Sequence, residues 1–256
     1  MSSSSATGRC TDTQVSSLLS SIAIALLFIC LCGPAALAAN PSKESICDAT
    51  ADHYLVTEDY TAAIRLHREL LQKHPANALA HYHLGFAYGM TGDETQELNE
   101  YQRATALGLS RWDLFLNIGI AFLTNGNLAA ATDALRHAVR LDSKQPESHY
   151  NLGLVYERRN MLTEAEQEML STLRLAPKLQ DARNMLGVIY ARQGKKAEAS
   201  AQWSLLLREA PDYSQARTNL EIVKSKAVEG DRETFAHAAT IPSSPISGAK
   251  AKSDHP

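Results

Sequence analysis

The chain has 256 residues, of which 25 are Lys or Arg and 28 are Asp or Glu, giving a formal net charge of -3. Nucleic-acid-binding proteins normally carry a basic surplus or a basic stripe, so this balance argues against nucleic acid as a partner. Hydrophobic residues make up 45% of the chain, which excludes a wholly disordered protein and agrees with a folded globular body.

The first 39 residues form a segment of their own. Residues 13–42 contain no charged side chain, most of them are apolar, and the small residues Ala36 and Ala38 stand near the end of the segment. This pattern is typical of a secretory signal peptide that is cleaved just after these alanines. We therefore expect an exported protein, periplasmic or secreted. An uncleaved membrane anchor over residues 16–39 is the alternative, because only one basic residue precedes the apolar run.

Three of the four cysteines lie within the predicted signal peptide and would leave with it. Bulky residues precede Cys30 and Cys32, which disfavours a lipoprotein signal. Cys47 would then be the lone thiol, without a partner for an internal disulfide. We interpret Cys47 as a small buried apolar residue, with a reactive or intermolecular thiol as the alternative.

The centre of the chain is periodic. Four glycines lie 34 residues apart, each followed three residues later by an aromatic residue: Gly85, Gly119, Gly153 and Gly187. Placing the glycine at position 8 defines five units, 44–77, 78–111, 112–145, 146–179 and 180–213, with Ala51 at position 8 of the first. The pattern resembles the tetratricopeptide repeat (TPR) family, whose unit is a helix–turn–helix. The resemblance implies an all-α fold, a right-handed α-solenoid, and binding rather than chemistry.

Within each unit, positions 4, 7, 8 and 11 share one face of a first helix, and positions 20, 24 and 27 share one face of a second. Position 15 is expected to end the first helix in a left-handed conformation, because Gly92, Gly126 and Gly194 occupy it, with Asn160 in the fourth unit. Glu97 stands at position 20, where the family commonly carries alanine. We therefore expect the second unit to be the loosest.

The last part of the chain changes character. Residues 214–227 read as a capping helix that completes an array over residues 40–227, because terminal repeats need a polar outer face. Residues 228–256 are rich in Ala, Ser and Pro and lack periodicity, which predicts a disordered tail.

The sequence contains no glycine-rich phosphate loop, no paired-cysteine zinc pattern and no Gly-x-Ser-x-Gly turn. The sequence thus predicts no catalytic residue, no cofactor and no metal site. His81 and His83 are two residues apart on a helix and point about 200° apart, so they cannot bind one ion together. The other repeat histidines are scattered over different units and are interpreted as packing or surface residues: His53, His67, His74, His137 and His149.

The resemblance also implies a binding groove, because positions 5, 6 and 9 of TPR first helices commonly face the concave side. These positions are apolar, aromatic or asparagine in the central units: Tyr82, Phe86, Leu116, Asn117, Ile120, Tyr150, Asn151, Leu154, Asn184 and Val188. An asparagine row can pair with the backbone of an extended peptide. The alternative is that these amides bond to neighbouring helices or to water.

Together these features predict a non-enzymatic scaffold that binds an apolar segment of a protein partner in its groove. The combination is similar to exported TPR proteins of the cell envelope that serve in pilus or secretion assembly. The alternative is a self-associating protein, a homo-oligomer or a chain whose groove captures its own tail. Membrane contact is expected only through an uncleaved N-terminal segment.

Overall fold

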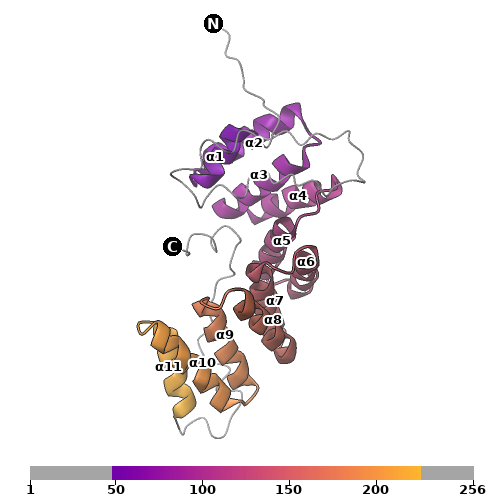
Figure 1. The fold of residues 1–256 in the computed structure, drawn as a ribbon. Helices are drawn as coiled ribbons and strands as arrows, with labels where there is room; N and C mark the ends of the chain where they lie inside the picture. The colour runs from indigo at the N-terminus through magenta and orange to yellow at the C-terminus, as the bar shows by residue number, and fades with distance from the viewer. Residues whose placement is uncertain (1–47, 226–256) are drawn as a thin grey trace. The chain divides into compact units, whose positions relative to one another are not determined.

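A computed structural model describes residues 48–225, which form helices α1 to α11 (Figure 1). Every regular element in this described range is an α-helix, and the pairs α1–α2, α3–α4, α7–α8 and α9–α10 pack as hairpins. The fold class predicted from the sequence, an all-α array of TPR hairpins of the α-solenoid type, is confirmed.

The helices follow the 34-residue period. Their bounds are α1 (Ala49–Val56), α2 (Tyr60–Lys73), α3 (Ala78–Thr91), α4 (Glu94–Ala106), α5 (Trp112–Thr124), α6 (Leu128–Leu141), α7 (Pro146–Arg158), α8 (Leu162–Leu175), α9 (Gln180–Arg192), α10 (Lys196–Glu209) and α11 (Ser214–Lys224). From α3 onward, each odd-numbered helix begins at position 1 of a unit. The first helix, α1, has only 8 residues.

Several predicted segments fall outside the described range. The signal peptide over residues 1–39, Cys47 and the tail over residues 228–256 lie there. The capping helix predicted at residues 214–227 corresponds to α11, which ends at Lys224. Among residues 48–225, none of the helices combines the length and the apolar content that a bilayer crossing requires.

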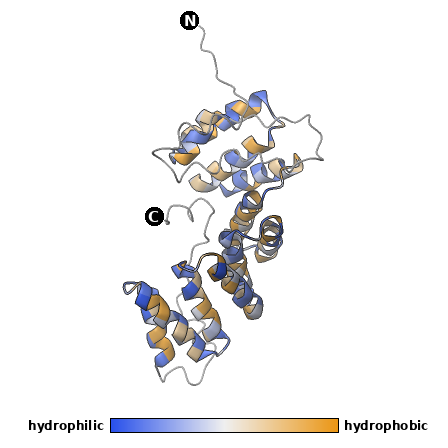
Figure 2. Ribbon diagram, in the orientation of Figure 1, coloured by the Kyte–Doolittle hydropathy of each residue, from blue (hydrophilic) through white to orange (hydrophobic). Residues whose placement is uncertain are grey.

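The described residues divide into two compact units, and the boundary falls within α5. The first unit ends at Ala121 and the second begins at Phe122. In the first unit, α2 packs against α1 and α3, and α3 packs against α4. In the second unit, α7 packs against α6 and α8, α8 against α9, and α10 against both α9 and α11. Apolar and polar residues share the individual helices, as expected for helices with one packed face (Figure 2).

The residue at position 15 follows the first helix of each repeat and has a left-handed backbone conformation. Gly92, Gly126 and Gly194 have φ values of 81, 74 and 81°, and Asn160 has a φ of 59°. These values confirm the sequence prediction. The first repeat carries Glu58 at this position, with a φ of 61°, although this conformation costs a residue with a Cβ about 1–2 kcal/mol.

The glycines at position 8 lie where a first helix meets the large side chain at position 24 of its own second helix. A Cβ built on Gly187 would lie 2.5 Å from Nε1 of Trp203. A Cβ built on Gly153 would lie 2.6 Å from Cε of Met169. Both large side chains are fully buried. Glycine is therefore favoured here by the close approach of a neighbouring side chain rather than by backbone conformation.

The two contacts differ in rigidity, and this difference predicts unequal mutational effects. The Trp203 indole is rigid and its Nε1 is held 2.9 Å from Oδ1 of Asn184, so it cannot yield to a new methyl group. We expect Gly187→Ala to lower the free energy of unfolding by about 1–3 kcal/mol through overpacking. In Gly153→Ala the flexible end of Met169 can move, and the gain in helix propensity offsets the cost, so the change should stay below about 1 kcal/mol. Urea unfolding of the two variants checks this order, and equal losses would contradict it.

Candidate functional site

Exposed apolar side chains gather on the first helices of the first unit. Met90 in α3, at position 13 of the second repeat, is 43% exposed, and Val56 at the end of α1, at position 13 of the first repeat, is 36% exposed. Phe86 lies one turn before Met90 on the same face of α3 and is half-buried. The Tyr60 ring packs edge-on against Phe86 with 6.4 Å between centroids, and α1 contacts α3. We call Val56, Tyr60, Phe86 and Met90 the apolar patch.

The predicted groove residues are mostly interior. Eight are buried: Tyr82, Leu116, Asn117, Tyr150, Asn151, Leu154, Asn184 and Val188. Phe86 and Ile120 are half-buried. The expectation that these side chains form an open apolar wall is therefore wrong for the buried eight. In a stacked array each repeat covers part of its neighbour, so positions 5 and 6 fall within the layer between repeats. A peptide-binding role for the set stays a prediction.

The buried tyrosine and asparagine of the first unit bond to each other. Asn117 donates from Nδ2 to the Tyr82 hydroxyl over 3.2 Å. The Tyr82 and Tyr101 rings lie 6.0 Å apart, and the Arg111 guanidinium stands 5.9 Å from the Tyr82 ring centre. Burial raises the pKa of Tyr82 well above its usual value, so the phenol stays neutral. These polar groups therefore hold consecutive repeats together.

A second polar contact of this kind lies in the second unit. Asn184 accepts at Oδ1 from Nε1 of Trp203 over 2.9 Å and from Nδ2 of Asn219 over 3.2 Å. Asn151 donates from Nδ2 to the Glu147 carbonyl over 2.9 Å. The asparagines expected to pair with a peptide backbone are thus bonded within the protein, as the alternative from the sequence proposed.

Histidine at position 4 joins each of two hairpins to the turn before it. In the second repeat, His81 Nδ1 lies 2.5 Å from Oε2 of Glu100, and its Nε2 lies 3.0 Å from the Pro75 carbonyl oxygen. The fourth repeat repeats the arrangement, with His149 2.6 Å from Glu168 and 3.0 Å from the Ser143 carbonyl. The Glu168 hydrogen bond raises the pKa of His149, which favours the charged ring. The sequence pattern placed position 4 on the packed face of the first helix but did not predict this contact.

Arginine takes over the same contact at the C-terminal end. Arg183 at position 4 of the fifth repeat donates from Nη2 to the Pro177 carbonyl over 2.8 Å, and Arg217 of α11 donates to the Pro211 carbonyl. In all four cases the donor and the carbonyl are six residues apart. The signal was present in the sequence as a column of His and Arg at position 4 of the repeats.

Glu97 is accommodated by a glycine on the facing helix. A Cβ built on Gly89 would lie 2.5 Å from Oε1 of Glu97, so the missing side chain provides room for the carboxyl group. Burial raises the pKa of Glu97 to about 7, against an opposing hydrogen bond from Tyr101. The second repeat thus accepts the unusual residue at position 20 by a paired change at position 12.

The raised pKa of Glu97 predicts that replacing this residue changes the stability of the protein by an amount that depends on pH. The Glu97 carboxyl binds its proton more tightly in the folded chain than in the unfolded chain, so its contribution to stability falls as pH rises from about 4.5 to about 7. Glu97→Gln imitates the neutral form. The variant should match the wild type near pH 4.5 and exceed it by about 1–2 kcal/mol at pH 8, allowing for solvent screening. Urea unfolding at several pH values measures the difference.

Exposed Glu198 of α10 provides the matched control. Glu198→Gln should follow the wild-type stability curve across the same range. A gap between Glu97→Gln and the wild type that is constant with pH would rule out the buried carboxyl as its cause.

The fold brings together two histidines that the sequence pattern did not connect. His67 of α2 and His83 of α3 lie with Asp52 of α1 in the first unit, and one ligand atom from each lies within 4.8 Å of the others. Burial, with a smaller contribution from His83, lowers the pKa of His67 to about 4, so this ring is neutral at neutral pH. The sequence signal was in two columns, position 24 of one unit and position 6 of the next.

Comparison with protein families gives two matches. A tetratricopeptide repeat model matches residues 49–110, and a TPR repeat model matches residues 119–160. Neither is a catalytic family. No curated protein sequence matches the chain.

Solved structures share the fold. YrrB, described as a TPR protein with an unusual peptide-binding site, is 22% identical, with 65% of this chain and 86% of YrrB covered at a TM-score of 0.60. MamA from Desulfovibrio magneticus RS-1 is 18% identical, with 64% and 93% covered at a TM-score of 0.60. Pseudomonas aeruginosa pilF is 20% identical, with 74% and 85% covered at a TM-score of 0.60. At these identities the likeness concerns the fold alone.

Proposed function

Because the chain belongs to the tetratricopeptide repeat family, a family of protein–protein interaction scaffolds, we propose that it is a non-enzymatic adaptor that binds an apolar peptide or protein segment. The binding surface is the apolar patch, which lies on α1, on α3 and at the start of α2. The observation that carries this assignment is the exposure of Met90 beside the half-buried Phe86, at successive turns of one first helix.

The chemistry of the patch suits an apolar ligand. Phe86 and Tyr60 supply aromatic surface, which is enriched among residues that dominate binding energy. Met90 adds a flexible thioether that adapts to differently shaped partners. The neighbouring buried polar groups, Tyr82 and Asn117, are bonded to each other and leave the patch itself apolar. Peptide binding by the YrrB fold is consistent with this use of the scaffold.

The proposed location of this adaptor rests on the N-terminal sequence. An apolar, uncharged leader that ends in small residues supports export, and an exported interaction scaffold fits a partner in the cell envelope. A role in envelope, pilus or secretion assembly is the corresponding proposal.

Photocrosslinking from the patch tests the binding assignment. A photoreactive residue at Met90 of the full chain should capture a partner protein in the producing cells. The same residue at Leu170 of α8, which is also 43% exposed, should not. With the captured segment as ligand, Phe86→Ala should weaken binding by about 1–3 kcal/mol, because a central aromatic contact is lost. Leu170→Ala is the matched control.

Two outcomes would contradict the assignment. Equal capture from Met90 and Leu170 would show that the patch has no special role, as would unchanged affinity in a Phe86→Ala, Met90→Ala double variant. A crosslinked product of twice the chain mass, with a dimer in light scattering, would favour self-association. Tyr150→Ala is a poor probe, because Tyr150 is 0% exposed and its truncation would open a cavity in the core.

A further inference from the structure

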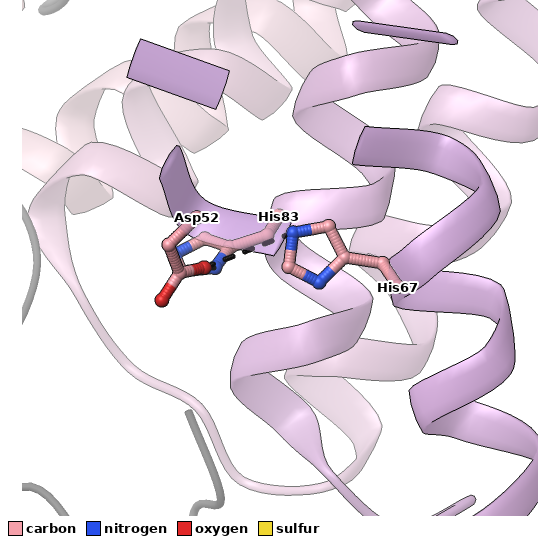
Figure 3. Close-up of side chains that lie close together, drawn as sticks. All are labelled: Asp52, His67 and His83. Atoms are coloured by element: carbon pink, nitrogen blue, oxygen red, sulfur yellow. Dashed lines mark ion pairs between the residues drawn. The ribbon is translucent and has the colours of Figure 1, made fainter. Parts of the chain in front are cut away.

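Three potential metal ligands converge between the first three helices. Asp52 comes from α1, His67 from α2 and His83 from α3, and their side chains face one another (Figure 3). Nδ1 of His83 and Nε2 of His67 lie 2.7 and 3.7 Å from the same atom, Oδ1 of Asp52. Asp52 and His67 are each 1% exposed. The cluster is thus a polar site that is almost closed to solvent.

The polar atoms of this cluster are poorly satisfied by hydrogen bonds. Neither carboxylate oxygen of Asp52 and neither ring nitrogen of His67 has a hydrogen-bond partner. The 2.7 Å approach of His83 to Asp52 is close but lacks hydrogen-bond alignment. Buried polar groups are nearly always paired, and an unpaired buried carboxylate is costly. The Asp52 carboxylate is therefore buried without a hydrogen bond, with the His67 and His83 rings as its nearest polar neighbours among the three side chains.

The same place in other repeats is filled differently. It combines position 24 of one repeat with position 6 of the next. At the second repeat these positions hold Tyr101 and Asn117, and at the fifth they hold Trp203 and Asn219. There, Asn117 bonds to the hydroxyl group of Tyr82, and Trp203 and Asn219 both bond to Asn184. In the first repeat the corresponding pair is His67 and His83, which lie beside the Asp52 carboxylate. Residue types that bind metals thus stand in the first repeat, where the other two repeats carry residues that hydrogen-bond to a third side chain.

We propose that Asp52, His67 and His83 bind one divalent transition-metal ion, and that zinc is its occupant. Imidazole nitrogen and carboxylate oxygen are zinc ligands, with bonds of about 2.0–2.2 Å. A tetrahedral ion at these distances separates its ligand atoms by about 3.3 Å, and the three ligand atoms already lie within 4.8 Å of one another. Small side-chain rotations complete the geometry, and water supplies the fourth ligand.

The ion would fasten the end of the array. α1 has 8 residues, too few for stability as an isolated helix. Its ligand Asp52 would be joined through the metal to one residue of α2 and one of α3. Metal binding therefore couples to the order of α1, and the free energy of binding adds to the stability of the first unit.

Zinc titration of the untagged full chain, after treatment with a chelator, tests this proposal. Calorimetry should give one ion per chain, and the melting temperature should rise with zinc concentration. Cobalt in place of zinc should give the intense visible absorption of a tetrahedral site. His67→Phe should weaken zinc binding more than about 100-fold, since loss of an outer partner of a ligand alone costs about 10–100-fold. Asp52→Asn should also abolish the zinc-dependent rise in melting temperature.

His53→Gln is the matched control, because His53 is an exposed histidine on α1 next to Asp52. This variant should bind zinc as the wild type does. His67→Phe also removes an unpaired buried imidazole, so the metal-depleted variant should remain folded, which circular dichroism verifies. Absence of one-to-one zinc binding, or equal binding by wild type and His67→Phe, would overturn the proposal and leave the cluster as a polar packing contact.

Discussion

The close contact between position 8 of the first helix and position 24 of the second sets the geometry of three hairpins. Tyr101, Met169 and Trp203 lie so near Gly85, Gly153 and Gly187 that a Cβ would force the facing side chain to move. This contact fixes the distance between the two helices of a hairpin. It also decides which side chains of the next first helix reach the same place, because consecutive repeats stack in a fixed register.

Buried polar side chains lie around that contact. Where position 24 is an aromatic residue with a hydrogen-bonding group nearby, the next repeat contributes an asparagine, and the polar atoms bond to each other, as in Asn184, Trp203 and Asn219. Where position 24 is His67, the next repeat contributes His83, and Asp52 lies with them. The contact between positions 8 and 24 therefore brings position 24 of one repeat close to position 6 of the next, and in different repeats these two positions carry either hydrogen-bonding side chains or potential metal ligands.

A second recurring feature is a hydrogen bond between the first helix of a repeat and the turn before it. A basic side chain at position 4 reaches back to a carbonyl six residues earlier, as His81, His149, Arg183 and Arg217 do. This contact satisfies a carbonyl oxygen that no helix can use. In the two histidine cases a glutamate of the second helix binds the other ring nitrogen, so one side chain connects the turn and both helices of the hairpin.

The sequence by itself determined the repeat, the helix starts and the left-handed turns, because a 34-residue period, small residues at position 8 and glycine at position 15 act locally or at fixed spacing. Only the tertiary structure decided which first-helix residues are exposed. Tyr150 and Leu154 stand at positions 5 and 9, which the family resemblance placed on the groove, yet packing against neighbouring helices buries them. Only the fold brings Asp52 close to His67 and His83. These three residues come from three helices and two repeats, so no local spacing in the sequence encodes the distances between them.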